Sequence, residues 1–463
     1  MDKLPPELIR DIFREATVVP GCLEIRLGSN AEDEDQLTSR VERSYWTKHS
    51  LSLVSKLFHE LADEYLYEYI HIRRHKHIRA LVRALRSLSF DRQPRGRWCR
   101  RLVLAFALWD VPWNWGGITL WGLLPSCPRL LDLHCYLNHD YAPYRNEFEQ
   151  WRFPVSPALA QILVALHGSR IRSLRLGWHM AITPELLERM LSHMPALRVF
   201  AIGYLQTRSP FPPPAQPLPE VSEEEMAYTE ADEAEFDPVE ELKEYREAAK
   251  TAEWPTESSA VFLPRLKRLD CSNFTPDIAH WHLPQLQEVT AGFDSRYLDR
   301  SDLVRLVLDI ALQPHAATIT HFTHASRPRI DIWSFVAEIL PNIVHFGCVI
   351  RAIWAQADLL APLPKLQTIT IIRAPNYTVD VLNFLFGVKR FVEAGLLPSL
   401  QIIRFAGDRE GTPSLVQSKE IFRKLGIRLV LMEGEAEGPY QEWWDRERYR
   451  GGQGRSLGVR RER

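Results

Sequence analysis

The chain has 463 residues, of which 45% are hydrophobic and 25% are charged, and its formal net charge is −2. This composition is typical of a soluble globular protein, and the overall charge gives no reason to expect binding to nucleic acid or to a membrane. No run of about 18 apolar residues is present, so no membrane span is expected. The N-terminus lacks the basic and apolar regions of a signal peptide.

The distribution of charge along the chain is uneven, and the cysteines indicate a cellular compartment. Between Glu220 and Glu257 there are 15 acidic and 3 basic residues, a local charge of −12, so the remaining chain carries +10. This pattern sets an acidic segment against a mildly basic body. The six cysteines form no C-x-x-C pair, which favours a reducing compartment, the cytoplasm or nucleus. They are Cys22, Cys99, Cys127, Cys135, Cys271 and Cys348.

The N-terminal part has two helical patterns separated by a polar stretch. Residues 4–16 place apolar side chains at helical spacing, with prolines at the start and Pro20-Gly21 after the end. Residues 28–44 are polar and predict a solvated loop. From His49 the sequence "HSLSLVSKLFHELADEYLYEYIHI" predicts an amphipathic helix or helix pair. Another helical pattern covers residues 77–88.

From residue 97 onward, a short phrase recurs in which an apolar residue is followed, three and five positions later, by two more. Seven copies start with proline, and the starts are 20 to 41 residues apart except for one step of 69. The eleven copies are "RWCRRLVL" (97–104), "PRLLDLHC" (128–135), "SRIRSLRL" (169–176), "PALRVFAI" (195–202), "PRLKRLDC" (264–271), "PQLQEVTA" (284–291), "ATITHFTH" (317–324), "PNIVHFGC" (341–348), "PKLQTITI" (364–371), "PSLQIIRF" (398–405) and "LGIRLVLM" (425–432).

The recurrence predicts an α/β repeat fold. The alternating end of each phrase predicts a short strand, and the segments between phrases carry helical patterns. Units of this length that cannot bury their apolar face alone are typical of a solenoid of stacked repeats. The long step contains a proline-rich and acidic stretch, residues 207–258, which we interpret as a disordered insertion between two repeats. The Arg-rich end, 435–463, is expected to be flexible.

The two N-terminal half-motifs together resemble the F-box. That motif runs Leu-Pro-x-Glu-(Leu/Ile), then Ile-(Phe/Leu), then Leu-x-x-Val-(Cys/Ser)-(Lys/Arg)-x-(Phe/Trp), and then small and apolar residues that lead to a Leu-Tyr step. An F-box followed by leucine-rich repeats resembles fungal F-box-like substrate receptors of cullin-based (SCF) ubiquitin ligases. The resemblance covers 4–72 by motif and 97–434 by architecture, with an insertion at about 21–48 between the half-motifs. The positions that match the motif are Leu4, Pro5, Glu7, Leu8, Ile12, Phe13, Leu53, Val54, Ser55, Lys56, Phe58, Leu61, Ala62, Leu66 and Tyr67.

The resemblance implies a division of the chain into an F-box-like helical domain (1–72), a helical linker (73–96), repeat units (97–206 and 259–434), the insertion and the tail. It also implies a non-catalytic receptor, without a cofactor, that binds a Skp-type adaptor and a target protein. The residues expected to contact the adaptor are Leu4, Pro5, Glu7, Leu8, Ile12, Phe13, Leu53, Val54 and Phe58. The runner-up interpretation is a repeat scaffold without a ligase connection, in which the N-terminal helices only cap the repeats.

Residues between the buried strand positions should share one sheet face, which predicts the surface that binds the target. These residues mix acid, base and imidazole, as suits a protein or peptide ligand. They are Asp132, His134, Arg175, Arg268, Asp270, Glu288, His321, His345 and Arg404. Each of them also fits a merely solvated face.

Other motifs give weaker indications. The stretch "HIRRHKHIR" (71–79) has no single histidine face and no acidic or cysteine partner, so a basic linker is favoured over a metal or nucleic-acid site. Cys127 and Cys135 form a conceivable redox pair, whereas the repeat positions of Cys135 and Cys271 favour buried structural thiols. No nucleophile elbow, phosphate-binding loop, zinc-protease motif or dinucleotide turn occurs, and nothing in the sequence argues for an enzyme.

Overall fold

A computed structural model describes fifteen stretches of the chain and leaves the remaining residues undescribed. The described residues are 5–17, 19, 31–72, 77–89, 92–105, 123–136, 153–155, 157–205, 261–271, 276–293, 301–325, 332–349, 361–372, 378–406 and 413–432. The expected insertion (207–258) and the expected flexible tail (435–463) therefore lie outside the described residues.

The centre of the protein is one open sheet in which every described pair of neighbouring strands is parallel. Twelve strands follow one another in chain order, and the short β4 pairs at the side of β5. The strands are β1 (Tyr69–Ile72), β2 (Arg101–Ala105), β3 (Asp132–Tyr136), β4 (Phe153–Pro154), β5 (Ser173–Ile182), β6 (Val199–Leu205), β7 (Arg268–Cys271), β8 (Glu288–Ala291), β9 (His321–His324), β10 (His345–Val349), β11 (Thr368–Ile372), β12 (Ile402–Ala406) and β13 (Arg428–Met432).

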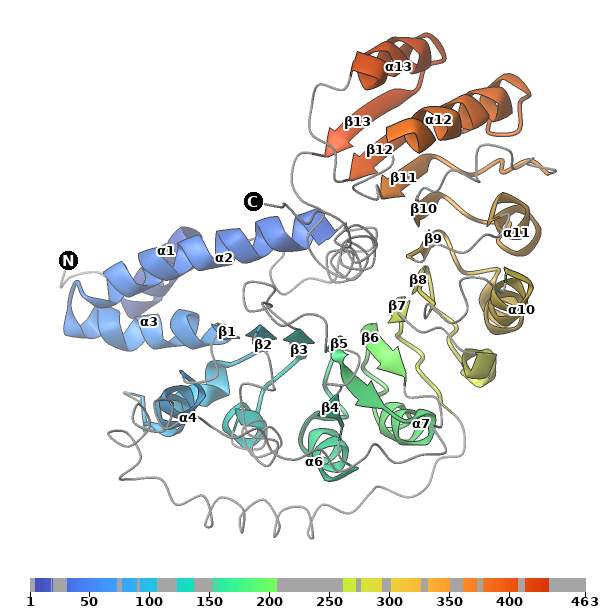
Figure 1. Cartoon of the computed structure of the whole chain (residues 1–463). Helices are drawn as coiled ribbons and strands as arrows, with labels where there is room; N and C mark the ends of the chain where they lie inside the picture. Colours follow the sequence, from blue (N-terminus) through green and yellow to red (C-terminus); the bar gives the residue numbers. More distant parts are fainter. Residues whose placement is uncertain are drawn as a thin grey trace, which may run out of the picture.

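Helices lie between the strands in the chain. Figure 1 shows α4, α6, α7 and α10 to α13 along the outer side of the curved sheet, whereas α1, α2 and α3 lie together beside β1. The helices are α1 (Pro6–Thr17), α2 (Ala31–Ser52), α3 (Lys56–Glu68), α4 (Ile78–Arg86), α6 (Pro157–His167), α7 (Pro184–Leu191), α10 (Ser301–Leu312), α11 (Ile332–Ile339), α12 (Thr378–Glu393) and α13 (Pro413–Lys424), with 3₁₀ helices η2 (Arg95–Trp98), η7 (Pro276–His280) and η9 (Gln313–His315).

The strands are aligned so that equivalent positions form continuous rows across the sheet. The second position of each of the twelve strands that follow chain order is a buried apolar residue on the helix side, because alternate side chains of a strand point to the same face. This row is Ile70, Leu102, Leu133, Leu174, Phe200, Leu269, Val289, Phe322, Phe346, Ile369, Ile403 and Leu429. One hydrophobic core therefore runs from β1 to β13.

The prolines of the repeated phrase start a tight turn before the strand. In the phrase of β3, the amide of Leu130 donates to the carbonyl of Cys127 at 3.0 Å, and the phrases of β6 and β7 have the same bond. Pro128 is the second residue of its turn, where its fixed φ is favourable. The residue that closes each of these turns is buried, as Leu130 is. The eleven phrases of the sequence all lead into strands, β2, β3 and β5 to β13.

The helices α1, α2 and α3 form a helical unit with a separate small core. This core consists of Ile9, Phe13, Phe58, Leu61, Ala62 and Tyr65. The Phe13 ring lies 5.1 Å from that of Phe58 and 5.8 Å from that of Tyr65, measured between centroids. The Tyr65 hydroxyl donates to the carbonyl of Arg10 at 3.0 Å, so α1 and α3 are joined by a hydrogen bond as well as by apolar packing.

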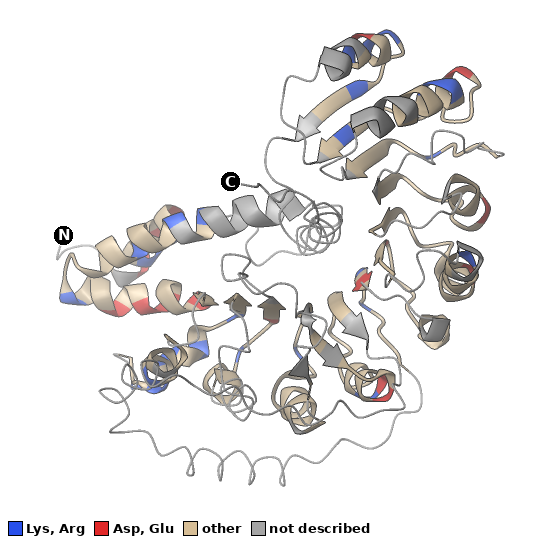
Figure 2. Ribbon diagram, in the orientation of Figure 1, with Lys and Arg blue, Asp and Glu red and all other residues tan. Residues whose placement is uncertain are grey.

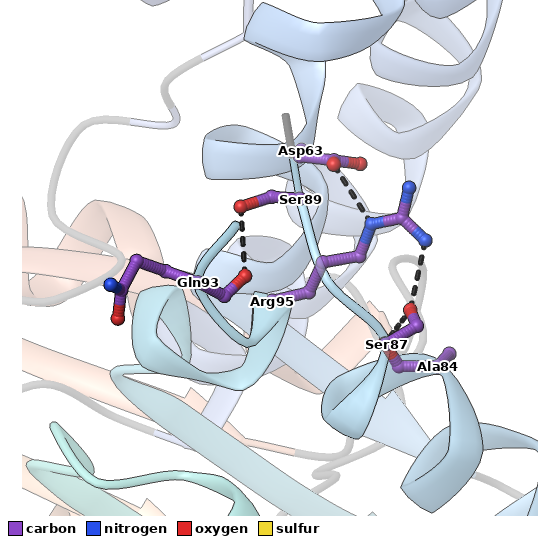
Figure 3. A network of polar contacts seen from close by, with 6 residues as sticks. All are labelled: Asp63, Ala84, Ser87, Ser89, Gln93 and Arg95. Atoms are coloured by element: carbon purple, nitrogen blue, oxygen red, sulfur yellow. Dashed lines mark hydrogen bonds and ion pairs between the residues drawn. The ribbon is translucent and has the colours of Figure 1, made fainter. Parts of the chain in front are cut away.

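The helical unit is attached to the sheet without a linker, since α3 ends at Glu68 and β1 begins at Tyr69. Figure 3 shows the polar contacts beside this attachment, in which Arg95 Nε donates to Asp63 Oδ2 at 2.8 Å and Arg95 Nη1 donates to Ser87 Oγ at 3.0 Å. Asp63 belongs to α3, and Ser87 follows α4. The buried Gly96 follows Arg95, and a Cβ atom on it would lie 1.7 Å from the carbonyl oxygen of Ser126. Because no side chain fits at this distance, residue 96 must be a glycine.

Two expectations for the N-terminal part are wrong. Residues 28–44 were expected to be a loop, but α2 covers Ala31–Ser52, because Val41 packs on the sheet residues Tyr69 and Val103 and so stabilises a mostly polar helix. The end of the second half-motif, "YIHI", was expected to be helical, but it is the strand β1, paired with β2. With β1 and the short β4, the sheet has two strands more than the eleven phrases predict.

The other boundaries are placed as follows. The segment 73–96, expected to be a linker, includes α4, whose Ile78 and Leu85 belong to the main core. β6 and β7 pair directly in register, Val199 with Arg268, so the sheet continues between the two strands that flank the long step in the sequence. Cys135, Cys271 and the other described cysteines are buried and form no disulfide, which confirms the expectation of buried thiols.

Candidate functional site

Exposed apolar side chains gather on the helical unit. Among the described residues, twelve large hydrophobic side chains are exposed, and half of them lie in the first 57 residues. These six are Leu8, Ile12, Trp46, Leu53, Val54 and Leu57. Isolated exposed hydrophobic residues are ordinary on a protein surface, but a concentration of them indicates a contact surface.

The sequence of α1 produces one broad apolar stripe, of which one edge is buried and the other is exposed. Ile9 and Phe13 face the core of the helical unit and are almost completely buried, whereas Leu8 and Ile12 are 50% and 49% exposed. Residues four apart lie on the same side of a helix, so Leu8 and Ile12 form one exposed pair. The core of the unit is complete without them.

The turn between α2 and α3 exposes further apolar residues. Ser55 is the N-cap of α3, and its Oγ accepts a hydrogen bond from the amide of Phe58 at 3.2 Å. A serine in this place satisfies an unpaired amide of the first helical turn. Leu53 and Val54, directly before the cap, are 72% and 56% exposed. Figure 1 shows this turn at the end of the unit nearest to the N-terminus.

The residues expected to bind an adaptor therefore fall into three groups. Leu8, Ile12, Leu53 and Val54 are exposed apolar residues, which we call the docking face; Pro5 and Glu7 are exposed as well. Phe13 and Phe58 are buried against each other and cannot contact a partner directly, which corrects the expectation for these two residues. Leu4 lies outside the described residues.

The residues expected to bind a target all lie on the inner face of the sheet. Each of the nine occupies the first or third position of its strand, opposite to the buried second row. In chain order they are Asp132, His134, Arg175, Arg268, Asp270, Glu288, His321, His345 and Arg404. The structure thus brings them to one face, although most of them are largely buried.

An ion cluster lies in the middle of the inner face. Arg268 Nε donates to Asp270 Oδ2 at 2.9 Å, and Arg268 Nη1 lies 3.5 Å from Glu288 Oε1. All three side chains are buried. A buried arginine with two carboxylates is stable only because the charges compensate one another. These residues consequently hold neighbouring strands in place in addition to forming part of the face.

His134 contacts one neighbouring side chain through each of its two ring nitrogens. Arg101 Nη2 lies 3.3 Å from His134 Nδ1, and His134 Nε2 lies 3.0 Å from Ser173 Oγ. Because a guanidinium group can only donate, Nδ1 accepts, and the proton of the neutral ring is on Nε2, which donates to Ser173. Burial, then Arg101 and Arg175, lower the pKa of His134 well below its usual value. This histidine therefore cannot take a proton from Ser173, and the group is not a nucleophilic triad.

The neighbouring Asp132 has an unusual pKa for a carboxyl group. Burial raises the pKa of Asp132 to about 6, although Arg101, Arg175 and Arg172 act in the opposite direction. Desolvation disfavours the charged form, and here it exceeds the attraction of the three guanidinium groups. Below pH 6 this carboxyl group is protonated, and at neutral pH it adds a buried negative charge to the inner face.

A histidine pair lies further along the same face. The rings of His321 and His345 are 5.5 Å apart, and His345 Nε2 lies 2.8 Å from Thr370 Oγ1. Burial, then His321 and Arg404, lower the pKa of His345 to about 3, and burial lowers the pKa of His321. Both rings are therefore neutral at physiological pH and act as hydrogen-bonding groups, not as charges.

Several residues of these surfaces were missed from the sequence. Leu57 belongs to the same apolar stripe as Leu53, and the stripe alone could not show which members face solvent. Trp46 lies between the expected loop (28–44) and the helical pattern that begins at His49, and belonged to neither prediction. Arg101 and Ser173 occupy the same row as Asp132, and the spacing of their phrases, "RWCRRLVL" and "SRIRSLRL", would have been sufficient to include them.

Other kinds of site are not found in the described part of the chain. No group of three or more histidine, cysteine or carboxylate side chains there could hold a metal ion, although residues 73–76 of the histidine-rich stretch are not described. Within the same residues, no helix combines the length and the apolar character needed to cross a membrane. Cys127 lies beside Cys99, with both thiols free, and not in a disulfide with Cys135.

Two comparisons with known proteins gave no match for this chain. No protein-family model matches it, and no curated protein matches it.

Proposed function

We propose that this protein is the substrate-recognition subunit of an SCF-type ubiquitin ligase. The helical unit, as an F-box-like domain, binds a Skp-type adaptor through the docking face, and the repeat sheet binds a target protein. The observation that carries the proposal is the exposure of Leu8, Ile12, Leu53 and Val54 on a unit whose own core is already complete. Apolar anchors at helical spacing are the usual way in which a helix enters a partner's groove.

The sheet supports the second half of the proposal. Its strands follow chain order, pair in parallel and carry helices on the outer side, and we propose that they are stacked repeats of a leucine-rich type. Such a receptor makes and breaks no bonds. It accelerates ubiquitin transfer by holding a lysine of the target close to the charged enzyme, which is catalysis by proximity.

The test is co-purification of the full chain with a Skp-type adaptor. We expect association at about micromolar concentration, and we expect the double substitution Leu8→Asp and Ile12→Asp to weaken it at least tenfold, because two charges would enter an apolar contact. The matched control is Leu306→Asp with Ile310→Asp on α10, an exposed pair with the same spacing and 53% and 44% exposure. Equal binding by both variants would contradict the docking face, and no association of the unchanged chain would contradict the ligase connection.

The second candidate is a non-catalytic repeat scaffold in which the helical unit serves as a cap. The contact of Val41 in α2 with Tyr69 and Val103 favours it, because this contact covers the first strands of the inner face. A cap needs no partner, so it predicts that the Leu8 and Ile12 substitutions leave every interaction unchanged.

A further inference from the structure

A row of basic side chains follows one edge of the sheet, where the chain enters strands β3 to β7. In each entering segment, residues on either side of the buried turn-closing residue point away from the core, and most of them are basic. We call these residues the basic edge: Arg129, Arg170, Arg172, Arg198, Arg265 and Lys267. In Figure 2, blue segments are visible on the connections that lead into the strands of this region.

The backbone of the sheet places these residues in consecutive rows. The amide of Arg198 donates to the carbonyl of Arg172 at 2.7 Å, and the amide of Lys267 donates to the carbonyl of Arg198 at 2.8 Å. Arg172, Arg198 and Lys267 therefore occupy the same position in three neighbouring units. Neighbouring strands are about 4.8 Å apart, so the four units from β3 to β7 extend the basic edge over about 14 Å.

Positive charges outnumber negative charges in the described residues along this edge. The entering segments 123–131, 165–172, 192–198 and 261–267 contain no aspartate or glutamate. Among the described residues, no ion pair or side-chain hydrogen bond is made by Arg129, Arg172, Arg198, Arg265 or Lys267, and Arg170 donates only to the carbonyl of Pro128. Elsewhere the arginines Arg95, Arg100, Arg268, Arg305 and Arg423 each contact a carboxylate. Among the described residues, Asp132 at the start of β3 acts electrostatically on Arg172, and the basic edge still carries an excess of positive charge.

We propose that the basic edge binds an acidic peptide segment of a partner protein, in extended conformation across the sheet. An extended chain advances about 3.3 Å per residue, so about five residues cover the 14 Å of the basic edge. Arginine side chains bind carboxylates in two-pronged geometry, which suits a run of glutamate or aspartate. This surface differs from the docking face and from the inner face, and it does not depend on the ligase connection.

A nucleic acid is the competing partner for a basic surface, and the structure favours the peptide. Proteins that bind single strands stack the bases on aromatic side chains placed along the basic groove. In the four entering segments, the one aromatic residue besides histidine is Phe262, whose ring stacks on that of His282 at 5.1 Å. The residues between the basic positions are the buried apolar residues that close the turns, so the basic edge has charge without a stacking surface.

The test is fluorescence anisotropy of a labelled peptide of about six glutamates with the full chain at about 50 mM salt, where charge interactions between surfaces are weakly screened. We expect saturable binding that weakens when salt is raised, and no binding of the corresponding glutamine peptide. The triple substitution Arg172→Gln, Arg198→Gln and Lys267→Gln should weaken binding about tenfold, because each exposed ion pair contributes modestly.

The matched control removes three exposed positive charges elsewhere, with Arg10→Gln, Arg86→Gln and Lys424→Gln. Equal weakening by the two triple variants would overturn the proposal, since it would show an effect of net charge alone. Tighter binding of an oligouridylate of the same length than of the peptide would overturn it in favour of nucleic acid. Failure of the unchanged chain to bind the peptide would also overturn it. Thermal unfolding of each variant shows whether the fold is retained.

Discussion

The helical unit and the sheet bury their apolar residues to different extents. The sheet has one continuous core, in which side chains such as Phe322 and Phe346 are completely buried. The helical unit has a core of six residues and leaves a similar number of large apolar side chains exposed. Both regions satisfy their internal packing. The difference indicates that the sheet is built mainly for stability, and that the helical unit keeps apolar surface available for a contact.

The largest expected effect concerns the core of the sheet. Phe322 is buried beside Phe335 and Phe346, with ring centroids 5.9 Å and 6.4 Å away. Phe322→Ala should lower the free energy of unfolding by about 4 kcal/mol, because it removes buried apolar surface and leaves a cavity. Urea denaturation measures this value. A loss below about 1 kcal/mol would show that this part of the sheet is not the rigid core described above.

Asp132 should have the next largest effect, with the opposite sign. Its folded-state pKa of about 6 is above the value of about 3.9 in an unfolded chain, so stability is lost as pH rises between these values. Asp132→Asn removes the buried charge and should raise the free energy of unfolding by about 3 kcal/mol near pH 7.5. Near pH 4, denaturation should give almost the same free energy of unfolding for Asp132→Asn and for the unchanged chain. The same gain at both pH values would contradict the pKa assignment.

His345 should make stability depend on pH in the opposite sense. Since its pKa is lowered to about 3, the unfolded chain takes up a proton below about pH 6.5 that the folded protein excludes. Stability therefore falls as pH falls from 6.5, by about 1.4 kcal/mol per pH unit for one histidine. His345→Asn should reduce this slope by that amount in denaturation curves between about pH 6 and pH 4. His167, with a pKa of about 4, keeps its own contribution in the variant.

The smallest expected effect is on the docking face. Leu8→Asp with Ile12→Asp should change the free energy of unfolding by less than about 0.5 kcal/mol, because both side chains are half exposed and neither belongs to a core. Thermal unfolding measured beside the Phe322 variant provides the comparison. A loss similar to that of Phe322→Ala would mean that these residues stabilise the helical unit, and the distinction between the two regions would fail.

The sequence was most informative where one period dominates. The eleven phrases predicted eleven strands and the face on which Asp132, Arg268 and Glu288 lie, because alternation in a half-buried strand is visible in the sequence. A sheet with helices on one side only keeps this alternation, whereas a sheet covered on both sides would show continuous apolar runs. The buried turn residues were part of the same phrase.

The helical unit was less predictable for physical reasons. The helix α2 is stabilised by the contact of Val41 with the sheet residues Tyr69 and Val103, and such a contact between distant parts of the chain leaves no local pattern. In α1 the apolar stripe is broad, so sequence alone could not separate the buried Phe13 from the exposed Ile12. The pairing of β1 with β2 likewise depends on a residue run, "YIHI", that continues a helical pattern.

The attachment of α3 to β1 has a mechanical consequence. With no residue between Glu68 and Tyr69, and with Arg95 holding Asp63 at 2.8 Å, the helical unit has no hinge at which to swing against the sheet. Two molecules bound to the helical unit and to the sheet would therefore stay at a constant distance from each other. A flexible linker would instead allow a range of distances. The position of a partner on the sheet would then decide which of its residues come close to a molecule bound on the helical unit.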